Sequence, residues 1–544
     1  MFAMPNAVQL VELAASLNLH LSHGEAELYL PFIVDAMREL DAFVQSRADE
    51  AAPPLLFPER APGYRPSLTE DRYLTWLWKC AIGGEDRGLL AGRTVSFKDH
   101  ISVAGIPQVF TSQVLESFIP DATVVSRVLE AGGKVVGKHM MNGFMGDYGK
   151  PLNPHNLERI TGGSSSGSGA ALAAGEVDIS FGGDQGGSIR LPAAYCGVVG
   201  LKPTFGLVSH FAVGFAFEPS VDHVGPMART VPDVAAALQA VAGYDDYDPR
   251  QRRGIPERMD ALSDLDGGVR GLRIGILEEG FAEPIEPDVA AGVLAAVSTL
   301  EELGAEVTRI SVPQHAQIDS VYAALVFEGA RAIYDVGFFG TGAKTYYPAS
   351  IITAIDRMWR THSDMMQPRT KLSHLIAELS RRNYHGGVYA KAHNVRPSYV
   401  AAFDRVLAKV DVLALPTVRN IAPRAQAARV WWVIAPSSAT ATRPCTISSA
   451  VTIRVASSAA ALGEQFLRSD RDSKAANWKT PKRWQRMKAR ARRNSTIAPA
   501  IRSRSMRSNG YQSDASGSGA DVQRRWAPTT LRSFRSLRAR RPLP

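Results

Sequence analysis

The most informative part of the chain is residues 162–190, GGSSSGSGAALAAGEVDISFGGDQGGSIR. It begins and ends with a turn rich in glycine and serine, and small or apolar residues fill most of the segment between them. Ser164 in the first turn lies 24 residues before Ser188 in the second. Glycine lets several backbone N–H groups crowd one point, and a nucleophilic serine needs such donors around it. The stretch therefore predicts two turns that act together in one site.

A candidate base lies far upstream, where Lys98 stands in the sequence SFKDH over residues 96–100. A lysine accepts a proton only when it is neutral, and burial favours the neutral form by lowering the pKa. The pattern around Lys98 predicts a short strand that delivers the lysine at its end and buries its other positions. The apolar residues that alternate around it are Val95, Phe97, Ile101 and Val103.

Together these segments resemble the amidase signature family. The resemblance also rests on CGVVGLKPT over 196–204 and DHVGP over 222–226, and it covers roughly residues 85–420. The helical N-terminal extension and the run YDPRQ over 247–251 resemble the bacterial short-chain and aromatic amide amidohydrolases in particular. The family implies an α/β fold, in which helices cover a mixed, twisted β-sheet.

The resemblance also implies the chemistry. Members of this family cleave amides with a Ser–Ser–Lys triad, which here corresponds to Ser188 as nucleophile, Ser164 as bridging serine and Lys98 as base. In the family the bridging serine follows a cis peptide bond. The implied reaction converts an amide to a carboxylate and ammonia, with no metal and no organic cofactor. The oxyanion hole is expected from the backbone N–H groups of Ser188 itself and of Gln185, Gly186 and Gly187.

Other motifs near the two turns do not fit their usual functions. GSSSG over 163–167 matches a nucleophile elbow, but the polar stretch before it is not the hydrophobic strand that an elbow follows. The glycines lack the Gly-Lys-Ser/Thr ending of a phosphate-binding loop. Cys196 is expected to be a packed small residue, and Asp184 and Arg190 are expected to hold the second turn by polar contacts. The sequence has no cluster with zinc-ligand spacing.

The chain is expected to have three parts: a helical extension over residues 1–85, an amidase-like core over 86–424 and a basic tail over 425–544. Alternating strand and helix patterns indicate the α/β core. The extension is predicted from apolar residues at helical spacing over 6–47, among them Ile33, Met37, Leu40 and Val44. The strands expected in the core are 94–97, 134–137, 272–277, 307–312 and 411–416, and the helices are 122–131, 230–242 and 288–303.

The net charge differs in sign between the two regions of the chain before and after residue 425. Residues 425–544 contain 24 Lys and Arg against 5 Asp and Glu, a net charge of +19, whereas residues 1–424 carry −10. Family members normally have the last core strands and a helix in this region, and no counterpart is visible here. One hypothesis is an out-of-frame translation of the true C-terminal region. The competing interpretation is a disordered basic tail.

Composition favours a cytoplasmic enzyme. Three cysteines without metal-ligand spacing suit a reducing compartment, and no signal peptide and no apolar stretch of about 20 residues is visible. The expected partners are a small-molecule amide and a second copy of the chain, with neither nucleic acid nor membrane. The alternatives are a glutamine amidase subunit of a tRNA-dependent amidotransferase, which lacks such a helical extension, a nucleic-acid-binding protein acting through the tail, and a defective product.

Overall fold

The computed structural model describes residues 3–46, 53–110, 112, 120–142, 150–214, 218–251, 254–334 and 345–425. The predicted basic tail thus lies outside the described residues, apart from Ala425.

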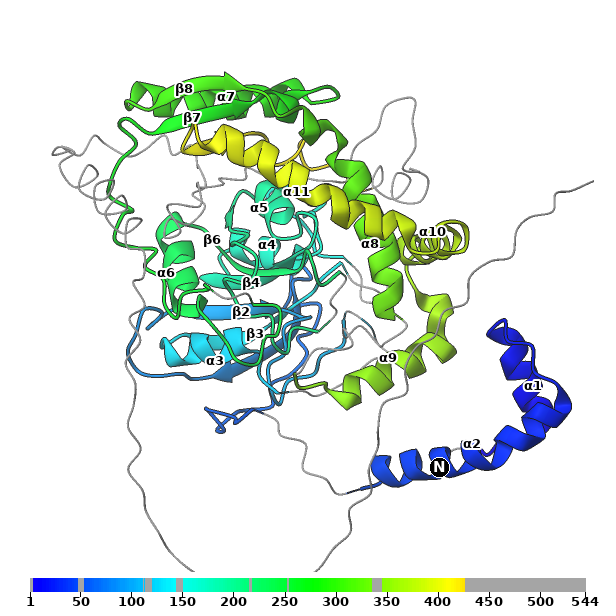
Figure 1. Ribbon diagram of the computed structural model, residues 1–544. Coiled ribbons are helices and arrows are strands. Elements are labelled where there is room, and N and C mark those ends of the chain that lie inside the picture. The colour runs from blue at the N-terminus through cyan, green and yellow to red at the C-terminus, as the bar shows by residue number, and fades with distance from the viewer. Residues whose placement is uncertain are drawn as a thin grey trace, which may run out of the picture. The chain divides into compact units, whose positions relative to one another are not determined.

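A six-stranded mixed sheet carries the predicted catalytic turns (Figure 1). The central strand β2 is parallel to its neighbours β3 and β4, and the pairs β1–β3, β4–β6 and β5–β6 are antiparallel. The mixed sheet confirms the predicted α/β fold class. In the order β1-β3-β2-β4-β6-β5, the strands are Trp76–Ile82, Lys134–His139, Thr94–Lys98, Ile179–Asp184, His223–Ala228 and Val199–Gly200.

Four helices accompany this sheet: α3 (Thr123–Glu130), α4 (Ser166–Ala173), α5 (Arg190–Cys196) and α6 (Val231–Val241). Helix α6 contacts β6, and α4 contacts β4 (Figure 1). Alternation along β2 and β4 places large apolar side chains in the core, where Phe97 stacks on Phe181 with ring centroids 5.6 Å apart. The first Gly/Ser-rich turn is followed directly by α4, whose residues from Ser166 to Leu172 are buried.

A second, three-stranded parallel sheet has the order β8-β7-β9. It is built from a βαβ unit, in which Val297 and Leu300 of α7 pack against Ile274 and Ile276 of β7. The third strand comes from far along the chain, since Ile274 pairs with Val412. The elements are β7 (Arg273–Leu277), η1 (Glu278–Phe281), α7 (Pro287–Glu302), β8 (Glu306–Ile310), η2 (Pro313–Gln317) and β9 (Val412–Ala414).

A group of helices connects β8 to β9. Helix α8 contacts both α10 and α11 (Figure 1). Polar contacts between these helices include the backbone N–H of Tyr389, which donates to Glu328 Oε2 at 2.9 Å. The elements are α8 (Ile318–Tyr334), α9 (Ala349–His362), η3 (Ser363–Met365), α10 (Pro368–Tyr384) and α11 (Gly387–Leu407).

The predicted N-terminal helices are two, α1 (Ala7–Ser16) and α2 (His23–Val44). Both begin with a capping box, which Asn6 forms for α1 and Ser22 for α2. Their small shared core contains Ala7, Leu10 and Ala26. The face predicted for α2 is only partly buried, because Leu40 and Val44 are exposed. Helix α1 has 10 residues against 22 in α2 and is too short to cover its second half.

Candidate active site

Lys98 is the last residue of β2, and its side chain lies inside the protein with only 1% of the residue exposed. Its Nζ donates to Ser164 Oγ at 2.7 Å and to the carbonyl oxygen of Gly183 at 3.4 Å. Burial lowers the pKa of Lys98 to about 7, although the negative charges of Asp184 and Asp222 oppose this shift. The amine therefore changes its protonation state near neutral pH.

Ser164 stands at an unusual point of the backbone. The peptide bond between Gly163 and Ser164 is cis, as the resemblance implied. The carbonyl oxygen of Ser164 accepts a hydrogen bond from the N–H of Asn142 at 3.0 Å, which ties the turn to the residues that follow β3. This backbone path leaves the Ser164 side chain half-buried beside the Lys98 amine.

Ser188 lies in the second turn, between the end of β4 and the start of α5. The N–H of Ser165 donates to the carbonyl oxygen of Ser188 at 3.1 Å, so the two turns are in direct contact. The Ser188 side chain is half-buried, and its hydroxyl makes no hydrogen bond among the described residues. The structure thus joins Lys98 to Ser164, while a hydroxyl contact between Ser164 and Ser188 stays a prediction.

A buried ion pair shapes the second turn. The Asp184 carboxylate accepts hydrogen bonds from Arg190 Nε and Nη2, both at 2.9 Å. It also accepts from the N–H groups of Gly187 at 2.7 Å and Ile189 at 3.1 Å, on either side of Ser188. Burial opposes ionisation of Asp184, but Arg190 and these donors outweigh it, and the pKa lies below the usual value. This confirms that Asp184 and Arg190 hold the turn.

The same contacts bear on the predicted oxyanion donors. The N–H of Gly187 donates to Asp184 here, so it would have to leave that bond to reach a substrate. Gly186 faces α8, because a Cβ built on it would lie 2.0 Å from the hydroxyl of Tyr322. No sequence pattern pointed to Tyr322, since one tyrosine among the apolar residues of a helix resembles any core residue.

Two residues near the candidate site, Asp99 and Cys196, are buried. Asp99 forms an ion pair with Lys138 at 3.0 Å, and both side chains are fully buried. Cys196 is buried, and burial raises the pKa of its thiol to about 12, which leaves the thiol protonated and a poor nucleophile. Within the described ranges, no group of three or more His, Cys, Asp or Glu side chains is arranged to hold a metal ion. No helix in those ranges combines the length and apolar character needed to cross a membrane.

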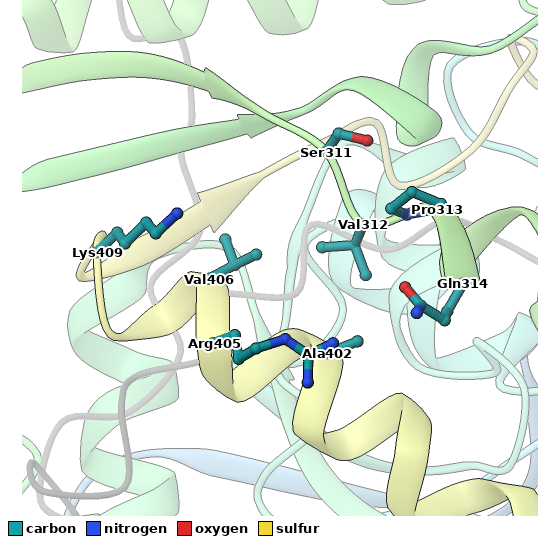
Figure 2. A pocket seen from close by; sticks show the side chains of 8 residues that line it. All are labelled: Ser311, Val312, Pro313, Gln314, Ala402, Arg405, Val406 and Lys409. Atoms are coloured by element: carbon teal, nitrogen blue, oxygen red, sulfur yellow. The ribbon is translucent and has the colours of Figure 1, made fainter.

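A cavity of about 440 Å³ lies elsewhere, between residues 311–314 and the end of α11 (Figure 2). The opposite side of this cavity is formed by Ala402, Arg405 and Val406 of α11 and by Lys409, which follows the helix. None of the three predicted catalytic residues lines this cavity, so it is separate from the candidate active site.

Comparison with known proteins identifies the family. A family model described as Amidase matches residues 77–461, and the chain belongs to this family. The chain is 39% identical over 356 residues to the A subunit of glutamyl-tRNA(Gln) amidotransferase from Picosynechococcus sp., and the match covers 63% of this chain and 72% of that protein. The family match starts after α2 and continues past residue 424, where the core was predicted to end.

Solved structures lead to the same family. The structure of the A subunit of glutamyl-tRNA(Gln) amidotransferase from Thermotoga maritima has a TM-score of 0.51 at 32% identity, and the match covers 63% of this chain and 71% of that one. A structure described as an amidase has a TM-score of 0.50 at 27% identity, with coverage of 62% and 70%. An amide-hydrolysing enzyme family is thereby established for this chain.

Proposed function

We propose that the protein hydrolyses linear carboxylic amides through an acyl-enzyme on Ser188. The observation that carries the proposal is the 2.7 Å hydrogen bond from the buried Lys98 amine to Ser164, whose turn contacts that of Ser188. A lysine whose pKa burial lowers to about 7 is a competent proton acceptor at neutral pH. The roles of Ser188 as nucleophile and Ser164 as bridging serine are those that the family resemblance implies.

The reaction follows from this arrangement. Ser188 Oγ attacks the amide carbonyl, and its proton passes through Ser164 to the neutral Lys98 amine. Backbone N–H groups of the second turn, including those of Gln185 and Gly186, stabilise the negative oxygen of the tetrahedral intermediate. The same proton then goes to the leaving nitrogen, and ammonia departs. Water repeats the sequence against the acyl-enzyme, which yields the carboxylate and free Ser188.

A second candidate function is the glutamine amidase subunit of an amidotransferase. It is favoured by the names of the relatives that match this chain at 37–39% identity. These names support this alternative better than they support an amidase acting alone. The helices α1 and α2 lie ahead of the family match and weigh in the other direction.

Ammonia release separates the two functions. The purified protein would be incubated with acetamide, propionamide, benzamide and glutamine, with Ser188→Ala as the catalytic control and circular dichroism to verify folding. Hydrolysis of a simple amide that disappears in Ser188→Ala supports the stand-alone amidase. Activity on glutamine alone supports the amidotransferase alternative. A folded wild-type protein that releases ammonia from none of the four contradicts the proposal.

A further inference from the structure

The residues that follow β3 lie beside the first Gly/Ser-rich turn. In the sheet, Lys98 at the end of β2 is paired with His139 at the end of β3. The chain that leaves β3 therefore passes the point where the Lys98 amine meets Ser164. Here the backbone N–H of Asn142 donates to the carbonyl oxygen of Ser164 at 3.0 Å. This segment is thus joined directly to Ser164.

The half-buried side chain of Asn142 holds the same turn at a second point. Its Nδ2 donates to the carbonyl oxygen of Gly162 at 3.3 Å. The two carbonyl groups that Asn142 contacts, those of Gly162 and Ser164, lie on either side of Gly163 in the chain. One residue therefore restrains the backbone both before and after the point at which the chain enters Ser164.

Gly163 provides the space for the Asn142 side chain. A Cβ atom built on Gly163 would lie 2.2 Å from Asn142 Nδ2, 2.8 Å from its Cγ and 3.1 Å from its Cβ. Among the described residues, these are its three nearest atoms. The φ of Gly163 lies outside the left-handed region, so the backbone conformation does not itself require glycine. The contact with Asn142 is what excludes a side chain at residue 163.

The position of this turn determines where the Ser164 hydroxyl lies. The amine of Lys98 donates to Ser164 Oγ at 2.7 Å, and the proposed proton transfer passes through this bond. Lys98 is the last residue of a strand in the sheet, whereas Ser164 lies in a turn outside any helix or strand. A catalytic arrangement loses rate when one of its groups shifts by a fraction of an ångström, so a turn of this kind needs residues that fix it.

We propose that Asn142 is a positioning residue, which holds the first Gly/Ser-rich turn so that the Ser164 hydroxyl meets the Lys98 amine. The inference rests on the proposed function, in which Ser164 passes the proton to Lys98. It assigns a role to a residue that the family resemblance left without one, and it accounts for the glycine at residue 163.

The first test compares Asn142→Ala with Asn153→Ala. Asn153 is the matched control, because its Nδ2 also donates to backbone carbonyl oxygens, those of Ile160 at 3.2 Å and Tyr195 at 2.9 Å, but it does not contact the turn. Both variants lose hydrogen bonds and should lower the midpoint of urea unfolding. In amide hydrolysis, kcat should fall about 10- to 100-fold for Asn142→Ala alone, with KM changed less than about threefold, because the proton path and not substrate binding is disturbed.

Gly163→Ala tests the contact itself, with circular dichroism to verify that each variant is folded. The new methyl group must displace the Asn142 amide, so kcat should fall about as far as in Asn142→Ala. In the double variant Gly163→Ala/Asn142→Ala the amide is already absent, and kcat should stay close to that of Asn142→Ala. Residues that act through one contact are non-additive in this way.

Three results would overturn the inference while leaving the proposed function intact. They are a kcat for Asn142→Ala equal to that of the wild type, an equal fall in kcat for Asn153→Ala, and losses that multiply in the double variant. The wild type also has to release ammonia and to be labelled at Ser188 by a fluorophosphonate probe. A folded wild type that does neither would overturn the proposed function and this inference with it.

Discussion

At the scale of single residues, the site contains two buried ionisable groups, Lys98 and Asp184, whose surroundings favour different charge states. Among the described residues, the Lys98 amine has one side-chain hydrogen-bond partner, the Ser164 hydroxyl, so burial favours its neutral form. The Asp184 carboxylate accepts four hydrogen bonds, two of them from Arg190, and stays ionised. Two ionisable groups that are both buried thus differ in their favoured charge state, because only Asp184 has a charged partner and several N–H donors.

The first prediction concerns the pH dependence of amide hydrolysis. Burial depresses the pKa of Lys98 to about 7, so the amine is protonated and inactive as a base below that pH and neutral above it. We expect kcat/KM to rise with pH along a single ionisation near pH 7 and then level off. Lys98→Arg should be inactive throughout, because a guanidinium does not lose its proton. A wild-type profile that is flat from pH 5 to pH 9 would exclude Lys98 as the base.

The second prediction concerns the buried ion pair between Asp184 and Arg190. Asp184→Asn removes the charge that Arg190 pairs with and weakens the acceptor for the N–H groups beside Ser188. We expect a loss of about 3–5 kcal/mol in the free energy of unfolding, measured in urea, and a large fall in kcat. Asp356→Asn breaks an exposed pair with Arg360 on α9 and should cost no more than about 0.5 kcal/mol. Equal losses of unfolding free energy in the two variants would show that the buried pair contributes no more to stability than the exposed pair.

At the scale of elements, local sequence patterns predicted several of the strands and helices around the candidate active site. The strands expected at 94–97 and 134–137 correspond to β2 and β3, and the helix expected at 230–242 corresponds to α6, which begins after Thr230, whose hydroxyl accepts from the N–H of Asp233. Local sequence patterns did not predict which distant segments of the chain contact each other. The pairing of β7 with β9 and the packing of α8 on the second turn depend on the whole fold, and no nearby residue signals them.

The third prediction tests this packing of α8. In Gly186→Ala the new methyl group would lie 2.0 Å from the Tyr322 hydroxyl, so the Tyr322 side chain, the helix or the turn must move. We expect kcat/KM to fall roughly 100-fold, because small displacements of backbone donors are costly in catalysis. Adding Tyr322→Ala should restore part of the loss. Gly292→Ala on α7, where nothing lies within 4 Å, is the control and should leave activity unchanged.

At the scale of the whole molecule, the composition that marks the two turns is visible in the sequence, whereas the segments that pack on these turns are not. Ser164 and Ser188 stand in one contiguous stretch with an unusual composition, so their pattern was visible without a structure. Tyr322 reaches the second turn from a separate segment, α8, and is an ordinary residue type in its local sequence. The predicted tail lies outside the described residues, so the choice between an out-of-frame translation and a basic tail still depends on its coding DNA.

The last prediction concerns the exposed apolar face of α2. Four large apolar residues lie on one face of this helix by their spacing, and each is more than half exposed. An exposed apolar stripe of this kind usually marks a protein contact, and we expect it to support the homodimer predicted from the sequence. The four residues are Leu28, Phe32, Leu40 and Phe43.

Sedimentation velocity tests this prediction directly. The wild type should sediment as a dimer, and the double variant Phe32→Asp/Phe43→Asp should sediment as a monomer, because two carboxylates would have to be buried in the interface. Leu375→Asp on α10, where the leucine is also more than half exposed, should leave the dimer intact. A wild type that sediments as a monomer, or a double variant that remains dimeric, would show that this face of α2 does not join two copies of the chain.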